Sequence, residues 1–167
     1  MTKFYSMRKN KNRGYQQLNI WQNARQLYVL TWKIVKQLPP ELRRIISNQM
    51  ASVDSIHRNI AEGYCRKGLK EYLQFLNYAI SSLGESVSSI NVYRAAGQIS
   101  YESFNEWDAL AYKTENQMIN LIKKLEFKKQ NKDWNDTFIV EEDNPIYGED
   151  GEAIQADLHL FLTNLLQ

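Results

Sequence analysis

Residues 69–90 read LKEYLQFLNYAISSLGESVSSI, and this stretch decides the fold. Large apolar residues recur in it at alternating spacings of four and three, at Leu69, Leu73, Leu76, Ile80, Leu83, Val87 and Ile90. Only an α-helix places that spacing on one side. Because such a helix has to bury its apolar side, the pattern predicts further helices packed lengthwise against this one.

Three other stretches provide these helices. The four predicted helices cover about residues 17–38, 41–63, 69–96 and 100–127. The first ends before Pro39-Pro40, because proline cannot continue a helix. Gly97 fits a C-cap of the third helix, and Ser100 fits an N-cap of the fourth. Short connections make neighbouring helices antiparallel, so the predicted fold class is all-α: an antiparallel up-down-up-down four-helix bundle with a C-terminal extension.

The second and fourth helices each have one apolar side that is predicted to face the core. In the second helix this side consists of Leu42, Ile46, Gln49, Val53, Ile56 and Ile60. In the fourth it consists of Phe104, Trp107, Ala111, Thr114, Met118, Leu121 and Leu125. Gln49 is the polar member, and we expect it to be a hydrogen-bonded device that fixes the register of the helices.

The first helix is apolar on more than one side. Its predicted core stripe is Leu18, Trp21, Tyr28, Trp32, Val35 and Leu38. Further apolar residues lie off that stripe, at Ile20, Leu27, Leu30 and Ile34. A helix of this kind is buried on more than one side, which indicates a subunit interface in addition to the internal core. A single thick core is the alternative.

Composition limits the class of protein. With 167 residues, 43% hydrophobic and 24% charged, the chain suits one domain with a sizeable core. The one cysteine, Cys65, excludes an internal disulfide, and with only His57 and His159 beside it no zinc site or other cofactor is expected. No segment approaches about 18 uninterrupted apolar residues, so we expect a cytoplasmic protein without a membrane span.

Charge is unevenly distributed along the chain. Residues 1–127 contain 18 Lys and Arg against 10 Asp and Glu, whereas residues 128–167 contain 3 against 9, within a formal net charge of +2. This shift predicts a basic N-terminal arm at residues 1–16, the helical bundle at 17–127 and an acidic C-terminal extension at 128–167.

The extension contains a further predicted helix at about residues 153–166. Its apolar side consists of Ile154, Leu158, Phe161, Leu162 and Leu165, and something has to cover it. One interpretation is that it docks on its own or a neighbouring bundle. The other is that it binds a separate protein partner.

Basic clusters are the main chemical signal. Arg58, Arg66, Lys67 and Lys70 gather around the predicted turn between the second and third helices. The N-terminal arm contributes Arg8, Lys9, Lys11 and Arg13, and the second helix begins with Arg43 and Arg44. Such clusters favour phosphates, so these residues are the candidate nucleic-acid-binding residues for RNA or DNA.

Other constellations indicate structure more than chemistry. Asn59 and Glu62 lie on one side of a helix that ends near Gly63, and we expect Glu62 to accept hydrogen bonds from the backbone or from an arginine such as Arg25 or Arg94. Asp54 and His57 could orient a general base, but no nucleophile is evident beside them. Residues 63–70 only superficially resemble a phosphate-binding loop, and we expect no catalytic or metal-binding residue.

Four runs of sequence point to a family. The chain reads LNIWQNAR at residues 18–25, NIAEGY at 59–64, KEYLQFL at 70–76 and SLGE at 82–85. Together these runs resemble the bacterial four-helix-bundle proteins called 23S rRNA intervening sequence proteins, over roughly residues 18–125. The run from 59 to 85 is the most specific part.

The resemblance implies a closed four-helix protomer that commonly assembles as a homopentamer. More distant relatives include the accessory subunit of diversity-generating retroelements, a basic pentamer that binds a reverse transcriptase and nucleic acid. The family usually has a proline and a small residue before the Asn-Ile-Ala-Glu-Gly run, whereas this chain has His57 and Arg58, so the family's helix kink is not expected here.

The sequence therefore predicts a non-enzymatic, homo-oligomeric helical bundle that acts as a nucleic-acid-binding accessory factor and contacts the phosphate backbone. The alternative is a protein-interaction adaptor or scaffold, such as the accessory subunit of a reverse transcriptase, that docks through its C-terminal extension.

Overall fold

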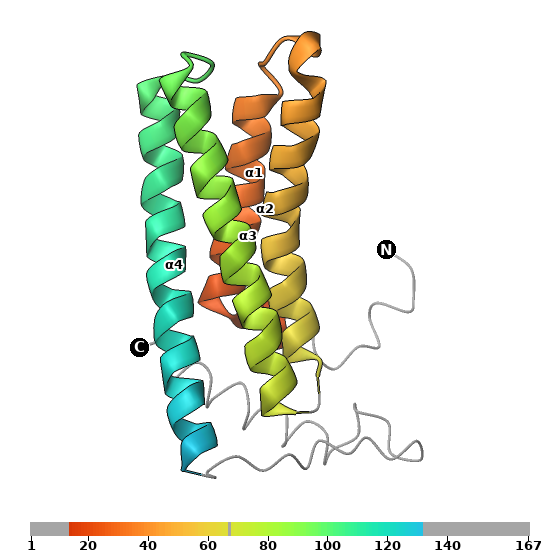
Figure 1. The fold of residues 1–167 in the computed structure, drawn as a ribbon, viewed down its shortest axis with the longest axis vertical. Helices are drawn as coiled ribbons and strands as arrows, with labels where there is room; N and C mark the ends of the chain where they lie inside the picture. The colour runs from red at the N-terminus through yellow and green to blue at the C-terminus, as the bar shows by residue number, and fades with distance from the viewer. Residues whose placement is uncertain (1–13, 67, 132–167) are drawn as a thin grey trace, which may run out of the picture.

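A computed structural model describes residues 14–66 and 68–131. Within them lie four long helices: α1 (Asn19–Val35), α2 (Arg43–Tyr64), α3 (Leu69–Ala95) and α4 (Tyr101–Gln130). Short 3-10 turns at Gly14–Gln17 and Pro40–Leu42 precede α1 and α2. The predicted helical bundle is confirmed, and consecutive helices run in opposite directions (Figure 1). The basic residues 1–13 and the predicted helix at 153–166 lie outside the described residues.

The core runs the length of the bundle and draws side chains from all four helices. Every predicted core residue of α4 is buried, as are Gln49, Val53, Ile56 and Ile60 of α2. On α3, Ile80 and Val87 are partly buried against the core, and the other five members of the stripe are buried. Leu42 and Ile46 of the predicted α2 side are half-buried outside the core, and Ile45 packs against the core in their place. Spacing therefore identified the core sides of α3 and α4, and that of α2 from Gln49 onward.

The predicted core stripe of α1 is wrong. The side that faces the core holds Ile20, Ala24, Leu27, Leu30 and Thr31, whereas Tyr28 and Trp32 are 37% and 51% exposed. Of the predicted stripe, only Leu18 and Val35 are buried. Both sides of this helix carry enough apolar side chains to be predicted as the core side. The true core side is harder to recognise in the sequence because it includes the small residues Ala24 and Thr31.

Local signals end the helices where the sequence predicts. Gly97 has a left-handed φ of 70°, and the bonds from Gln98 N to Tyr93 O (2.9 Å) and from Gly97 N to Arg94 O (3.0 Å) form a Schellman cap on α3. Ser100 caps α4 by accepting a hydrogen bond from Ser103 N at 3.2 Å. α2 continues as one helix through the position of the family's proline.

α2 and α3 make the most extensive contact in the bundle. At its lower part a Cβ on Gly63 would lie 2.7 Å from Phe75 Cβ, so glycine lets the two helices approach there. Higher up, Ser82 Oγ donates to Ser55 Oγ at 2.9 Å, and buried Gln49 points its Nε2 at Ser86 O, 3.5 Å away. These polar contacts fix the register of α2 against α3, as expected for Gln49.

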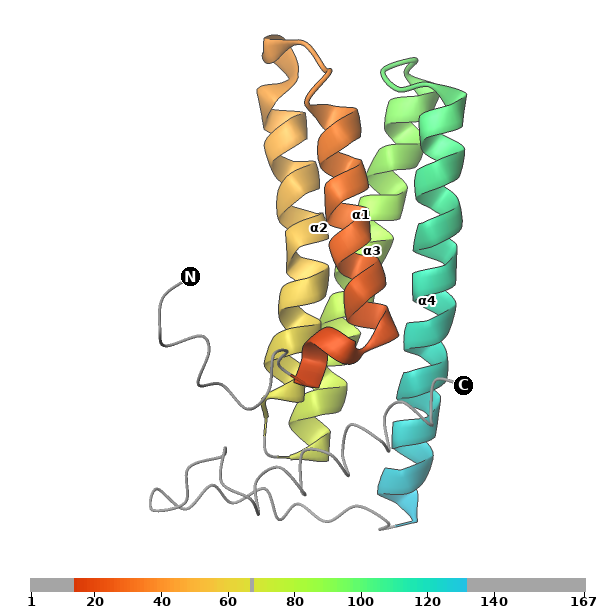
Figure 2. The same ribbon diagram turned by 180° about the vertical axis from the view of Figure 1, so that it is seen from behind.

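The connection between α2 and α3 lies at the same end of the bundle as the last turns of α4 (Figures 1 and 2). The start of α2 lies at the opposite end, beside the connection between α3 and α4 (Figure 1). None of the described helices is long and apolar enough to cross a membrane.

Candidate nucleic-acid interface

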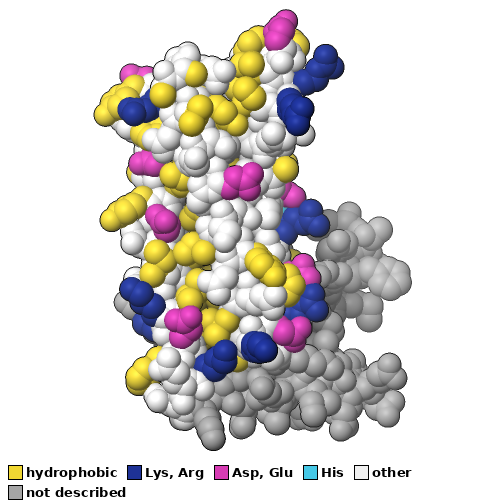
Figure 3. Space-filling view, in the orientation of Figure 1, with side chains coloured by type: hydrophobic (Ala, Val, Ile, Leu, Met, Phe, Trp, Pro, Cys, Tyr) yellow, Lys and Arg dark blue, Asp and Glu magenta, His cyan; other side chains and the backbone are white. Residues whose placement is uncertain are grey.

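Basic residues from separate parts of the sequence lie at the same end of the bundle. The last three turns of α4 contain four lysines, and they descend to the level of the α2–α3 connection (Figure 2). We call this group the basic end, and it consists of Arg66, Lys70, Lys123, Lys124, Lys128 and Lys129. Figure 3 shows Lys and Arg side chains along the lower part of the face formed by α3 and α4.

Two of the predicted phosphate-binding residues are engaged with acidic neighbours. Arg66 pairs with Glu62 one helical turn earlier, reaches Glu71 at 3.8 Å and covers the ring of Phe75 at 4.8 Å. Arg58 pairs with Asp54 at 3.3 Å and is 74% exposed. Surface pairs of this kind are weak, so each guanidinium is able to exchange its carboxylate for a phosphate at modest cost.

Lys70 is exposed in the first turn of α3 and has no ion pair with the part of the chain that the structure describes. Unlike Arg58 and Arg66, Lys70 therefore does not have to leave a described carboxylate in order to bind a phosphate. Lys67 lies between α2 and α3, outside the described residues.

The remaining predicted cations do not join this group. Arg43 and Arg44 are exposed in the first turn of α2, about 30 Å from its other end at 1.5 Å per residue. Arg8, Lys9, Lys11 and Arg13 lie outside the described residues. The predicted set is thus divided between the two ends of the bundle.

Sequence reasoning missed the four lysines of α4. They occur as two pairs, Lys123-Lys124 and Lys128-Lys129, spaced so that they recur on the final turns of the helix. The predicted antiparallel topology contains the signal that would have identified them, because it places the end of the fourth helix at the same end of the bundle as the turn between the second and third helices.

Glu62 pairs with an arginine, as expected, but the partner is neither Arg25 nor Arg94. Glu62 is exposed and pairs with Arg66, whereas Arg94 lies at the far end of α3 over the ring of Phe104, at 4.6 Å. Asn59 donates to Ser55 O at 2.8 Å and to Ser55 Oγ at 2.9 Å, and the same hydroxyl accepts from Ser82. Both bonds of Asn59 thus lie within α2, beside the Ser82–Ser55 bond between the helices, and its structural role stays a prediction.

Two tyrosines underlie the basic end. Tyr72 is buried, and Tyr64 is partly buried against the core. Neither hydroxyl has a hydrogen-bond partner among residues 14–66 and 68–131. Burial, together with the nearby Cys65, raises the pKa of Tyr64 to about 12, and burial beside Tyr64 raises the pKa of Tyr72 further above its ordinary value of 10.

His57 and Asp54 form a local pair on α2, with His57 Nε2 3.1 Å from Asp54 Oδ1. The imidazole packs edge-on against the rings of Trp21 and Tyr28 of α1, with centroid distances of 6.4 and 6.0 Å. Among the described residues, no group of three or more His, Cys, Asp and Glu side chains could hold a metal ion.

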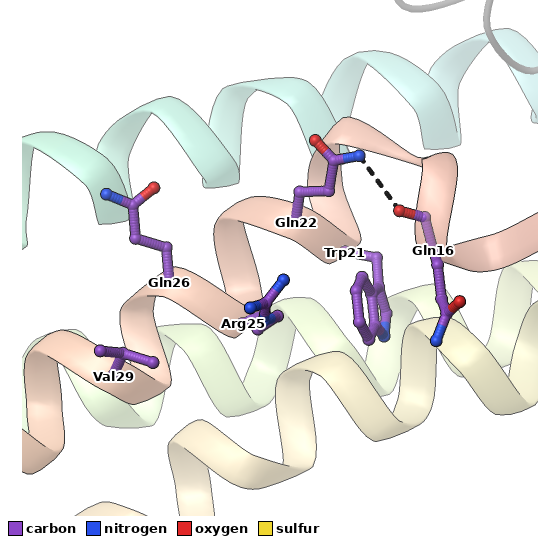
Figure 4. Close-up of a pocket in the computed structure, with 6 residues that line it drawn as sticks. All are labelled: Gln16, Trp21, Gln22, Arg25, Gln26 and Val29. Atoms are coloured by element: carbon purple, nitrogen blue, oxygen red, sulfur yellow. Dashed lines mark hydrogen bonds between the residues drawn. The ribbon is translucent and has the colours of Figure 1, made fainter. Parts of the chain in front are cut away.

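A shallow hollow lies on the outer side of α1, away from the core (Figure 4). It is lined by Gln16, Trp21, Gln22, Arg25, Gln26 and Val29. Within it Gln22 Nε2 donates to Gln16 O at 3.1 Å. The side chains come from α1 and the turn before it, so the hollow is a feature of a helix surface.

Comparison with known proteins gives one match. The family model of the 23S rRNA-intervening sequence proteins matches residues 16–126, from the turn before α1 almost to the end of α4. A search of curated proteins finds no match.

Proposed function

The chain belongs to the 23S rRNA-intervening sequence protein family, and we propose that it is a non-enzymatic, cytoplasmic accessory factor that binds RNA or DNA through phosphates. The observation that carries this proposal is that Lys70, at the start of α3, and the four lysines in the last turns of α4 lie at the same end of the bundle. Clustered cations on a rigid scaffold release counterions when they contact a polyanion, which favours binding without reading the bases.

The proposed binding mode lacks base stacking. The large exposed side chains of α4, Tyr101, Tyr112 and Phe127, are 61%, 66% and 64% exposed and are spaced along the helix, so they do not form one platform. Phosphate contacts therefore supply the affinity, and we expect weak sequence preference.

A homopentamer is the proposed assembly, in line with the resemblance described above. Each protomer leaves large apolar side chains exposed on α3 and α4, including Tyr78, Val92 and Tyr112. Such surface favours association between copies. A ring would repeat the basic end around its axis and raise the effective concentration of binding sites. The molar mass in solution tests the number of copies.

Salt dependence of binding tests the proposed function. If about four lysines each contact a phosphate of a duplex, affinity falls on the order of 100-fold between about 50 and 200 mM salt. The measurement is a filter-binding series on a random-sequence duplex and a random single strand. Affinity that is constant over this range would reject phosphate-backbone binding.

The second candidate is a protein-interaction adaptor, conceived as the accessory subunit of a reverse transcriptase. The exposed apolar side chains favour it, with Val92 and Tyr112 at 60% and 66% exposure. Removal of residues 132–167 separates the two functions. Loss of a protein partner with unchanged nucleic-acid binding would support the adaptor, because α4 and its lysines end before the cut.

A further inference from the structure

One side of α1 carries large side chains that the other described helices cover only in part, with His57 of α2 against the rings of Trp21 and Tyr28. Its residues recur at offsets of 4, 3, 1 and 3, and we call them the α1 stripe: Trp21, Arg25, Tyr28, Val29 and Trp32. Trp32, Val29 and Tyr28 are 51%, 45% and 37% exposed, and Trp21 packs partly against the core. Single exposed apolar residues are ordinary, but a continuous row along one helix indicates a docking surface.

The apolar side of residues 153–166 has the same spacing as the α1 stripe. Ile154, Leu158, Phe161, Leu162 and Leu165 also follow one another at offsets of 4, 3, 1 and 3. As helices, both rows extend about 16 Å, because each covers eleven steps of 1.5 Å. Two rows of equal length and matching ridges are suited to pack side by side.

Charge favours α1 over the other helices as the place where this segment docks. α1 contains Arg25 and Lys33 and no acidic residue, whereas each of the other three helices contains at least two. The chain from residue 128 onward holds nine acidic residues, among them Asp157 beside the apolar row. Arg25 is exposed within the stripe, in the hollow of Figure 4, and has no ion pair with a described residue.

The chain is long enough to reach. α4 ends at the end of the bundle where α1 begins (Figure 2), and the two helices touch through a 2.8 Å bond from Asn23 Nδ2 to Gln117 Oε1. Residues 132–152 span up to about 70 Å when extended, more than twice the length of α1. The connection therefore permits docking without strain.

We propose that residues 153–166 pack as a helix on the α1 stripe of their own chain. The contact covers Tyr28, Val29 and Trp32, and it holds the acidic residues 141–152 near the bundle. The inference does not depend on nucleic-acid binding, since none of the residues of the basic end belongs to the α1 stripe.

Disulfide trapping in the full chain tests this contact. In a Cys65→Ser background, Val29→Cys is combined with Leu162→Cys, and Tyr112→Cys with Leu162→Cys is the matched control on α4. Under a mild added oxidant, we expect an intrachain disulfide in the first pair that forms independently of protein concentration and at least several-fold faster than in the control. Equal rates in the two pairs would overturn the proposal.

Crosslinks between chains, in place of intrachain ones, would also overturn it and would assign the α1 stripe to a second copy. A separate readout is the tryptophan emission of a Leu158→Asp/Phe161→Asp variant. We expect a red shift relative to wild type, because Trp32 would lose its cover, and we expect Trp32→Phe to abolish that shift. Unchanged emission would contradict the contact even if the cysteine variants failed to fold.

Discussion

Trp107 Nε1 donates a hydrogen bond to Thr31 Oγ1 at 2.8 Å, and both side chains are fully buried. Thr31 in turn donates to Leu27 O at 2.7 Å, so the indole and the hydroxyl are both satisfied inside the core. The two residues lie 76 positions apart and join the first helix to the last. This bond joins the inward side of α1 to the core side of α4 and gives the buried indole N–H of Trp107 an acceptor.

Replacing Thr31 with valine should therefore destabilise the bundle. The change keeps the shape but leaves the buried indole N–H without an acceptor, at a cost of about 1–3 kcal/mol. Thr31→Ser retains the hydroxyl and should recover most of that loss. Urea unfolding followed by tryptophan emission measures both, and a Thr31→Val variant as stable as wild type would show that the bond contributes nothing.

Gly63→Ala should weaken the contact between α2 and α3. The added Cβ would lie 2.7 Å from Phe75 Cβ and 3.0 Å from Tyr72 Cδ2, so the two helices would have to separate, at about 1–3 kcal/mol. Gly84→Ala is the matched control. Gly84 lies inside α3 with nothing within 4 Å of its added Cβ, so alanine should raise stability by up to about 1 kcal/mol. In thermal unfolding, we expect the midpoint temperature of Gly63→Ala to lie below that of wild type and the midpoint temperature of Gly84→Ala to lie above it.

Stability should fall as the pH rises above 10. The pKa values of Tyr64 and Tyr72 are raised on folding, so the unfolded chain loses their protons first and the folded state binds more protons. For Tyr64 the loss extends from about pH 10 to about pH 12. Tyr72→Phe removes one of the two titrating groups. It should reduce the slope of the free energy of unfolding against pH by up to about 1.4 kcal/mol per pH unit. An unaltered slope in that variant would exclude Tyr72 as a cause.

Removing residues 132–167 should leave nucleic-acid binding intact or strengthen it. The deleted part holds nine acidic residues that compete with phosphate for the basic end. A full-length variant in which the six acidic residues of 141–152 are made neutral by Asp→Asn and Glu→Gln changes controls for length, and its affinity should shift from that of the full chain toward that of the truncated chain. Fluorescence anisotropy at low salt compares the three, and weaker binding by the truncated chain would mean that the extension itself contacts the nucleic acid.

The sequence was sufficient for the helices and for three of the four core sides. Regular spacing identified them on α2, α3 and α4 because each of these has one apolar side. It failed on α1, where the row from Trp21 to Trp32 carries large aromatic side chains, whereas the true core side includes the small residues Ala24 and Thr31. The bond from Trp107 to Thr31 is one contact that distinguishes the two sides, and a bond across 76 residues leaves no local pattern.

The candidate site was predictable in part. The sequence shows the basic residues near the α2–α3 connection as a cluster. The pairing of Arg66 with Glu62 depends on where α2 places the two side chains, and the contact of Arg66 with the ring of Phe75 depends on how α3 packs. The lysines of α4 lie more than 50 positions from Lys70 in sequence, so no local motif joins them. Topology brings them together, and the separation of Arg43 and Arg44 follows from the length of α2.

The most direct test compares nucleic-acid binding by two sets of lysine and arginine variants at the two ends of the bundle. Lys123, Lys124, Lys128 and Lys129 are changed together to Gln in one protein, and Arg43 and Arg44 to Gln in the other. We expect the first to lose most of its affinity and to have a salt slope reduced by about 0.7–0.9 for each lysine in contact, while the second remains close to wild type. Equal, small losses in both proteins, with folding intact by circular dichroism, would contradict a phosphate-binding surface at the basic end.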